Sequence, residues 1–324
     1  MYFPYLRGRQ NELLCIKELL ENGKLSDKII PVIEPVRFNS TFFMTLAKFV
    51  EMKRKIIIIR NPQVGSYKKD YHNMIRKISK EEDETKKNNL QKKLDLYLSL
   101  ELLTDENIID GYISNGEIVD KILNGEKKSE DIVVINKKTG DYVYYEENGE
   151  RLKAKITFIP NDEDFKDEVY GNVVMIKDCY NKAKKNVDYL NQPDEFFSRN
   201  HIVYAKRGYF GFSDYSIVGE EYDESGFAPS AIAIHIMYYG KNNELRIHHF
   251  VSDSNDTKSD LARKFEEAMS KLVSWEMYDE IPKTDGLNRL VECYYMGQYP
   301  GLGMIKRFSL MHHIQMMSEY LGDE

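Results

Sequence analysis

The sequences KIIPVIEP at residues 28–35 and KIIIIRNP at residues 55–62 decide the fold. Each is a short run of β-branched residues that ends in a polar or charged residue and a proline, which is typical of a strand buried on both faces. The segment between them has room for one helix. The two runs therefore predict parallel strands joined by a helical crossover. Ligands sit at the carboxyl ends of such strands, where Glu34 and Arg60 fall.

Further apolar runs supply the remaining strands of one sheet. With the two above, the predicted strand starts are Tyr2, Ile29, Ile56, Ile108, Ile132, Ile156 and Val173. An eighth strand must come from residues 212–220. This count favours an irregular (β/α)8 TIM-barrel-like fold over residues 1–220, rather than an open sheet.

The carboxyl-terminal region, residues 221–324, has a different pattern. Residues 231–239 and 244–252 flank a Gly-Lys-Asn-Asn turn and predict a β-hairpin. Helices are expected near residues 257–272 and 304–321. We expect this region to pack on the barrel and to be integral to the same domain. Residues 68–103 predict one long helix or two, and residues 140–151 predict a second hairpin.

Composition limits the classes of function. The net charge of −7 over 324 residues argues against an extensive phosphate-binding surface, although it allows a local basic groove. The chain has no run of about eighteen apolar residues and its amino terminus lacks a signal-like pattern. Three widely spaced cysteines fit a reducing compartment. We therefore expect a cytoplasmic protein that has no contact with a membrane.

Charged side chains follow several predicted strands and would share one rim of a barrel. Those expected to be catalytic, as metal ligands or proton-transfer groups, are Glu34, Asp178 and Asp214. Those expected to bind phosphate or another part of a ligand are Arg7, Glu12, Arg60, Lys177 and Arg207. Arginine grips phosphate oxygens with two hydrogen bonds, and carboxylates bind divalent ions or move protons. The alternative is that charges stand at strand ends because these ends reach water.

Glu34 is the most specific of these predictions. Pro35 disfavours helical geometry at Glu34, so the carboxylate stays at the strand end. Its desolvation needs a compensating partner, and Arg7 and Arg60 at the ends of neighbouring strands could reach it. We expect Glu34 in a concave pocket, within hydrogen-bonding or one-water reach of Arg7 or Arg60. On this basis Glu34→Gln would abolish function and leave the melting temperature nearly unchanged.

Two of the ligand-binding candidates allow a second interpretation. Glu12 falls in the first turn of a predicted helix, where the helix dipole favours a carboxylate, so capping alone could explain it. Arg207 lies in Lys-Arg-Gly-Tyr-Phe-Gly-Phe at residues 206–212. These bases and aromatics could hold phosphates and stack on nucleobases, but a turn leading into the last strand has the same composition.

The histidines and the missing motifs narrow the chemistry further. His235 could lie opposite His248 or His249 on the hairpin and bind a metal with an added carboxylate, but no HExxH or Cys/His spacing supports this, and a structural role for each histidine is favoured. His312 and His313 are possible site residues, but neighbours on a helix point about 100° apart. The sequence has no phosphate-binding GxxxxGK[ST], no GxGxxG and no GxSxG. These absences argue against a P-loop ATPase, a simple Rossmann dehydrogenase and an α/β-hydrolase, in that order.

Segments near both ends of the chain resemble a known family. Residues 2–9 (YFPYLRGR) with Glu12, residues 30–35 (IPVIEP), residues 299–303 (YPGLG) and residues 311–314 (MHHI) resemble the bacterial and phage beta family. The chain looks closest to the bacterial branch that is often encoded beside a PD-(D/E)XK nuclease-like protein. The resemblance implies a barrel-like fold, a place in anti-phage or mobile-element gene sets, and site roles for Arg7, Glu12, Glu34 and His312 or His313.

These observations lead to two hypotheses of function. In the first, the chain hydrolyses a phosphorylated or nucleic-acid-like ligand, such as a phosphodiester, with Mg²⁺ or Mn²⁺ as the expected cofactor. In the second, it is a non-catalytic sensor, or a binding subunit that regulates a nuclease-like partner encoded by a neighbouring gene.

Overall fold

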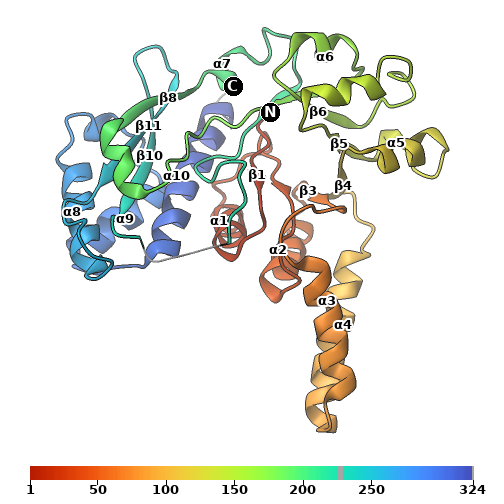
Figure 1. The fold of residues 1–324 in the computed structure, drawn as a ribbon, viewed down its shortest axis with the longest axis horizontal. Coiled ribbons are helices and arrows are strands. Elements are labelled where there is room, and N and C mark those ends of the chain that lie inside the picture. Colours follow the sequence, from red (N-terminus) through yellow and green to blue (C-terminus); the bar gives the residue numbers. More distant parts are fainter. Residues whose placement is uncertain (225–228, 323–324) are drawn as a thin grey trace. The chain divides into compact units, whose positions relative to one another are not determined.

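The computed structural model describes residues 1–224 and 229–322 (Figure 1). The main sheet has the strand order β1-β2-β3-β4-β5-β6-β7-β9, and its strands form a nearly closed parallel barrel of the predicted TIM-barrel-like kind. These strands are β1 (Tyr5–Leu6), β2 (Val32–Ile33), β3 (Ile56–Ile59), β4 (Ile108–Ile113), β5 (Val133–Ile135), β6 (Ile156–Pro160), β7 (Val173–Ile176) and β9 (Gly211–Ser213). The predicted pairing of the first two long runs is confirmed, because Val32 lies opposite Ile57 in parallel register.

The chain divides into two compact units, which are described separately. Unit 1 comprises residues 1–4, 18–29 and 177–324, and unit 2 comprises residues 5–17 and 30–176. Unit 2 therefore holds strands β1 to β7, whose β-branched side chains form its core. All four isoleucines of β3 are at most 1% exposed, as expected for a strand covered on both faces.

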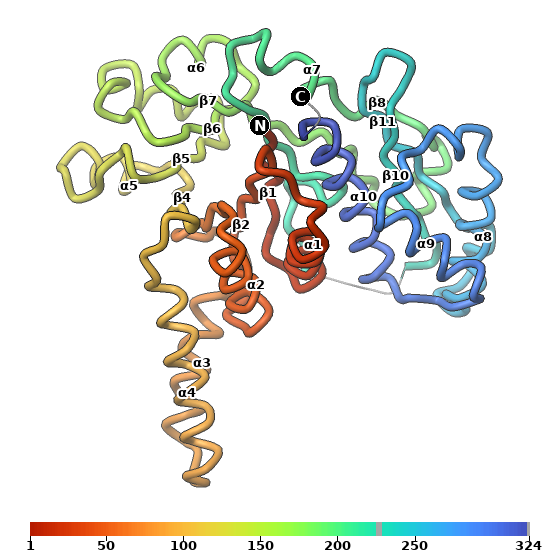
Figure 2. Tube along the Cα trace, turned by 180° about the vertical axis from the view of Figure 1, so that it is seen from behind, coloured from red at the N-terminus to blue at the C-terminus, as the bar shows by residue number. Residues whose placement is uncertain are grey.

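Helices alternate with the strands of unit 2. They are α1 (Gln10–Glu21), which continues into unit 1, α2 (Ser40–Glu51), α3 (Tyr67–Lys80), α4 (Glu84–Glu101), α5 (Gly116–Leu123) and α6 (Glu163–Asp167). Residues 68–103 thus form two helices, which lie side by side as a hairpin (Figure 2). The predicted second hairpin is wrong, since residues 139–144 form a 3-10 helix instead.

Unit 1 contains a three-stranded antiparallel sheet in the order β10-β11-β8. The hairpin of β10 (Ala233–Tyr239) and β11 (Leu245–Val251) was predicted, but β8 (Asp194–Ser198) was not. The helices of this unit are α7 (Asn200–Val203), α8 (Leu261–Val273), α9 (Asp285–Tyr295) and α10 (Leu302–Gly322). In α10, residues 308–318 are all buried, which explains why this stretch contains no charged Asp, Glu, Lys or Arg residue.

Candidate functional site

Glu34 is the centre of a buried ion cluster at the carboxyl ends of the unit 2 strands. Its side chain is fully buried, and its Oε2 accepts hydrogen bonds from the Tyr5 hydroxyl at 2.7 Å and from the Arg7 guanidinium. Lys137 Nζ lies 3.5 Å from the same oxygen, and Oε1 accepts from the Gln63 N–H at 2.8 Å. We call these five residues the strand-end cluster. The predicted pairing of Glu34 with Arg7 is confirmed.

The strand-end cluster keeps Glu34 ionised. Burial acts to raise the pKa of Glu34, but the charges of Lys137 and Arg7 and the hydrogen bonds from Gln63 and Tyr5 outweigh it, and the pKa is lowered. Two cations, Arg7 and Lys137, thus face one carboxylate.

Lys137 shows how strongly the sheet curves here. It follows β5, which is three strands from β2 in the sheet order, yet it reaches Glu34. In a flat sheet, strands three places apart are separated by about 14 Å. Lys137 Nζ also lies 4.7 Å from the centre of the Tyr5 ring, within the range of a cation–π contact. The curvature of the sheet thus brings together residues from β1, β2 and β5.

Arg60 lies in a different environment from the one predicted. Its Nε donates to Asp110 Oδ1 at 2.7 Å, and its Nη1 donates to the backbone carbonyl of Glu101 at 3.2 Å. Asp110 belongs to β4, where it lies opposite Ile58 of β3. Of the two predicted alternatives, Arg7 is therefore the partner of Glu34, and Arg60 bonds instead to the carboxylate of a neighbouring strand.

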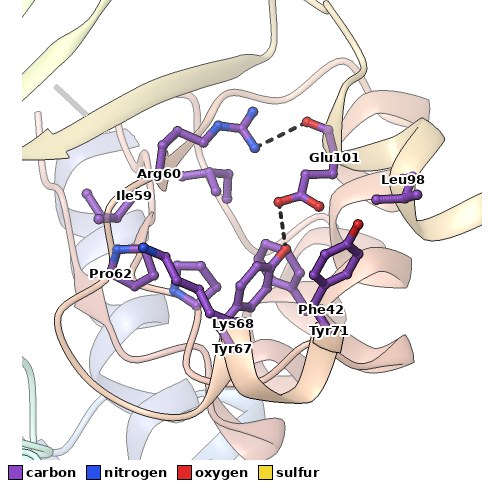
Figure 3. A pocket seen from close by; sticks show the side chains of 11 residues that line it. Phe42, Ile59, Arg60, Pro62, Tyr67, Lys68, Tyr71, Leu98 and Glu101 are labelled. Carbon is purple, nitrogen blue, oxygen red and sulfur yellow. Dashed lines mark hydrogen bonds between the residues drawn. The ribbon is translucent and has the colours of Figure 1, made fainter. Parts of the chain in front are cut away.

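Arg60 lines a cavity of about 260 Å³ between the end of β3 and helices α2, α3 and α4 (Figure 3). We call it the aromatic cavity. Its walls include the rings of Phe42, Tyr67 and Tyr71, and its cations are Arg60 and Lys68. Figure 3 shows the Glu101 carboxylate at its edge, accepting from the Tyr67 hydroxyl at 3.0 Å. The cavity combines flat apolar surface with charge.

The strand-end cluster supports the walls of the aromatic cavity. Pro35 and Pro62 both line the cavity, and each is next in the chain to a member of the cluster, Glu34 or Gln63. The hydrogen bond from Gln63 N–H to Glu34 therefore ties the loop after β3 to the end of β2. Loss of this bond is expected to loosen both walls.

The two other predicted carboxylates belong to unit 1. Asp214 is 1% exposed and its Oδ1 accepts from the Tyr2 hydroxyl at 2.7 Å and the Ser216 N–H at 2.8 Å. Burial raises the pKa of Asp214 to about 6, with a further contribution from the charge of Asp178 and against the two hydrogen bonds. Asp178 itself accepts from the N–H groups of Tyr180 and Glu220. The charge of Asp178 thus acts on Asp214, and both carboxylates belong to unit 1.

The remaining ligand-binding candidates are Glu12, Lys177 and Arg207. Glu12 accepts from the Arg7 N–H at 2.7 Å and the Arg9 N–H at 3.4 Å, so it caps the start of α1, as its alternative interpretation predicted. Lys177 and Arg207 are exposed side chains in unit 1. The stacking role proposed for residues 206–212 stays a prediction.

The histidine candidates make hydrogen bonds within unit 1. His312 is bonded on both sides, to Thr284 Oγ1 and to the Met237 carbonyl, each at 2.7 Å, which is a structural role. His313 Nδ1 lies 2.7 Å from Ser216 Oγ. His235 lies opposite His249, as one of the predicted pairings has it, with 2.7 Å between their Nδ1 atoms.

The predicted metal has no ligand set in the structure. Within residues 1–224 and 229–322, no three His, Cys, Asp or Glu side chains converge as a metal site needs. The oxygens of Glu34 are already occupied by N–H and O–H donors. The expectation of Mg²⁺ or Mn²⁺ therefore stays a prediction. In the same ranges, no helix is long and apolar enough to cross a membrane.

Comparison with protein families, with curated proteins and with solved structures finds no significant match. The resemblance to the beta family stays a prediction for this reason. The candidate site rests on the geometry of the chain alone.

Several site residues did not emerge from the sequence. Lys137 follows the predicted strand at residues 132–135, so the rule that gave Glu34 and Arg60 could have found it. Tyr67, Lys68 and Tyr71 come from α3, and no strand-end rule points to a helix. Their Tyr-Lys-x-x-Tyr spacing, which puts both rings on one helix face, was the available signal.

Proposed function

We propose that the chain recognises a nucleotide or nucleic-acid-like ligand at the aromatic cavity. The observation that carries this proposal is the combination, in one cavity at the carboxyl end of β3, of three aromatic rings with the cations Arg60 and Lys68. Every nucleobase has a flat face that stacks on such rings, each stack contributing about 1–3 kcal/mol. The cations would bind the phosphate.

The size of the aromatic cavity limits the ligand. Its volume of about 260 Å³ is slightly below the range of about 300–1,000 Å³ for pockets that enclose a drug-sized molecule. One nucleobase with its sugar partly outside fits this volume better than a dinucleotide. Arg60 is held in place by Asp110 and Glu101, so Lys68 is the more mobile cation and the better partner for a phosphate.

Titration calorimetry with a panel of nucleoside monophosphates and short single-stranded oligonucleotides tests this proposal. Lys68 lines the cavity and its neighbour Lys69 does not, although both are exposed, so they form a matched pair. Lys68→Met is expected to weaken binding about tenfold, and Lys69→Met to leave it unchanged. Tyr71→Ala should weaken binding further, whereas Tyr71→Phe keeps the stacking face. Equal effects of the two lysine variants would count against the cavity.

Hydrolysis of a phosphodiester is the second candidate, and Asp214 favours it. A carboxyl group with a pKa of about 6 can give a proton to a leaving oxygen near neutral pH. The test is release of 4-nitrophenol from bis(4-nitrophenyl) phosphate across pH 5–8, with and without Mg²⁺ or Mn²⁺. Asp214→Asn should remove the alkaline limb of the activity profile. Activity that this variant leaves unchanged would remove Asp214 from the reaction.

The resemblance to the beta family supports an anti-phage or mobile-element setting and a nuclease-like partner. In that setting the chain would act as a sensor whose ligand is a phage or host nucleotide. Co-expression of the chain with the protein of the neighbouring gene, followed by size-exclusion chromatography with and without the bound nucleotide, tests the partnership. Separate elution under both conditions would argue for an independent protein.

A further inference from the structure

Unit 1 has a second cavity, of about 290 Å³, that the proposed function does not use. Three lysines line it, Lys182, Lys184 and Lys306, all of them exposed. Lys182 has an acidic neighbour, Glu221, at 3.5 Å, and the side chain of Glu221 is 80% exposed. We call this space the lysine cavity. The charged residues of its lining are all lysines.

The inner end of the lysine cavity is formed by a chain of hydrogen bonds. Tyr180, Tyr189 and His235 line the cavity. The two tyrosine hydroxyls are 2.5 Å apart, Tyr180 Oη lies 3.2 Å from His235 Nε2, and His235 Nδ1 lies 2.7 Å from His249 Nδ1. His249 Nε2 lies 3.1 Å from Glu195 Oε1. These five residues form the Tyr-His relay.

Glu195, the last member of the relay, determines which atom donates and which accepts in every hydrogen bond of the relay. A carboxylate oxygen accepts, so His249 Nε2 donates to Glu195, and a neutral His249 must then accept at Nδ1. His235 Nδ1 therefore donates to His249, and His235 Nε2 accepts from the Tyr180 hydroxyl. The Tyr180 oxygen in turn accepts from Tyr189.

Two further observations agree with this direction. Burial lowers the pKa of His235 well below its usual value, with the His249 ring and the Lys306 charge acting the same way. Burial also lowers the pKa of His249, so both rings are neutral, as the directions require. At the other end, the Ala183 N–H donates to the Tyr189 oxygen at 3.1 Å, leaving the Tyr189 hydrogen for Tyr180.

The consequence is that the relay itself offers no free donor to the cavity. Each polar hydrogen of the relay donates to another member of the relay. The inner end of the cavity therefore presents aromatic rings and acceptor oxygens to a ligand. The ammonium groups are supplied by the lysines. The remaining lining includes Ile217, Ile232 and Ile305, which are at most 4% exposed and make the wall apolar. An anionic group is therefore favoured beside the lysines, and an apolar group is favoured deeper in.

We propose that the lysine cavity is a second binding site, for a small organic anion with a flat apolar body, whose charged group contacts the lysines and whose body lies against the Tyr-His relay. Phenyl phosphate is the probe that carries both parts. Inorganic phosphate carries the charged group alone, and phenol carries the body alone.

NMR chemical shifts of the histidine ring nitrogens, measured on the full chain labelled with ¹⁵N-histidine, report ligand binding at this site. The seven histidines give few signals, which single His→Gln substitutions assign. Without a ligand, His235 should be the Nδ1–H tautomer and His249 the Nε2–H tautomer. Saturating phenyl phosphate should shift the His235 signals and leave those of His72, an exposed residue in α3 of unit 2, unchanged.

Two variants separate the charged group from the body. Lys306→Met should weaken phenyl phosphate and inorganic phosphate alike, by about fivefold, whereas Lys241→Met, an exposed lysine in the hairpin turn, should change neither. Ala233 lines the cavity and is partly exposed, so Ala233→Leu should fill the inner part, abolish the phenyl phosphate shift and spare inorganic phosphate. Lys68→Met should leave the His235 shift intact, which separates this site from the aromatic cavity.

Three outcomes would overturn the proposal. One is a His235 signal that phenyl phosphate does not move. Another is a shift that persists in both Lys306→Met and Ala233→Leu. The third is the opposite tautomer at His235, because the relay would then present a donor to the inner end of the cavity.

Discussion

Glu34 and Asp214 are both carboxylates at the carboxyl ends of barrel strands, and both are almost completely buried, at 0% and 1% exposed. Their pKa values nevertheless move in opposite directions, down for Glu34 and up to about 6 for Asp214. Burial raises both. The difference comes from the partners, since Glu34 has two cations and Asp214 has a neutral hydroxyl, a backbone N–H and a neighbouring carboxylate.

This comparison separates two uses of a buried acid. A carboxylate that is ionised and paired with Arg7 and Lys137 holds strands and loops together, but its charge is already neutralised. A carboxyl group that titrates near pH 6 contributes less to stability at neutral pH and is available to exchange a proton. The strand-end cluster therefore suits positioning, whereas Asp214 changes its protonation state near neutral pH.

Removing the Glu34 charge should have the largest effect. Glu34→Gln leaves the buried Arg7 without its carboxylate, and breaking a buried ion pair from one side costs about 3–5 kcal/mol. Urea unfolding should show a loss of about 4 kcal/mol. The control is Asp110→Asn, because Asp110 is 42% exposed and its pair with Arg60 is worth less than about 1 kcal/mol. Equal losses in both variants would mean that burial does not strengthen the Glu34 pair.

Asp214→Asn should have an effect of the opposite sign. A raised carboxyl pKa means that the folded state binds the proton more tightly, so stability falls as pH rises from about 4 to about 6. The shift from 3.8 to about 6 corresponds to about 3 kcal/mol. Asn keeps an oxygen for Tyr2 and Ser216, so the variant should be more stable than the wild type at pH 7 by about this amount.

The pH dependence makes the Asp214 prediction specific. The gain in Asp214→Asn should shrink to near zero at pH 4, where the wild-type carboxyl is protonated. Thermal unfolding at pH 4, 5, 6 and 7 measures it. A variant that is equally stabilised at every pH would be explained by packing rather than by the charge.

The sequence was sufficient for the strands of the barrel because their signal is local. Runs such as Ile56–Ile59 need no partner to be recognised as buried strands, and their order along the chain is also their order in the sheet. The same locality gave the Glu34 and Arg7 pair, because parallel neighbours end at one edge. β8 lacked this signal, since Asp194–Ser198 has no β-branched residue.

The sequence failed where the partner comes from a distant element. Arg60 bonds to Asp110, fifty residues later, because the β3–β4 register places that carboxylate beside it. Glu195 reaches His249 through the pairing of β8 with β11. The expectation that Glu34→Gln spares stability did not foresee that Arg7, at 4% exposed, is buried together with the carboxylate. Full burial with four donors favours the opposite result.

Asp194 is a third carboxylate that can be compared with Glu34 and Asp214, and it is less buried than either. Its side chain is 27% exposed and accepts from Tyr238, from His248 and from the Arg246 guanidinium. Burial acts to raise the pKa of Asp194, but the hydrogen bonds from His248, Tyr238 and Arg246 lower it to about 2. A lowered pKa contributes stability above about pH 4 that is lost as the pH falls through about 2.

Asp194→Asn should therefore cost about 2 kcal/mol at pH 7, from a shift of 3.8 to about 2. The difference from the wild type should narrow below pH 4. Acid titration of the unfolding free energy of both proteins measures this. A cost that stays constant down to pH 2 would assign the effect to lost hydrogen bonds alone.

The smallest effect is expected at Lys137, the outer cation of the strand-end cluster. Its side chain is 14% exposed and its Nζ lies 3.5 Å from Glu34 Oε2, whereas Arg7 is 4% exposed and bonds to Glu34 directly. Lys137 makes the larger charge contribution to the lowered pKa of Glu34, but the direct bond from Arg7 should keep Glu34 ionised when Lys137 is removed. Lys137→Met should raise the pKa of Glu34 and lower the free energy of unfolding by about 1 kcal/mol, the upper end for a pair that reaches solvent.

Lys138→Met, the exposed neighbour, is the matched control and should cost less. A double-mutant cycle of Lys137→Met with Glu34→Gln isolates the pairwise energy. A coupling near zero would show that Lys137 is held by the Tyr5 ring, and that Glu34 depends on Arg7 alone.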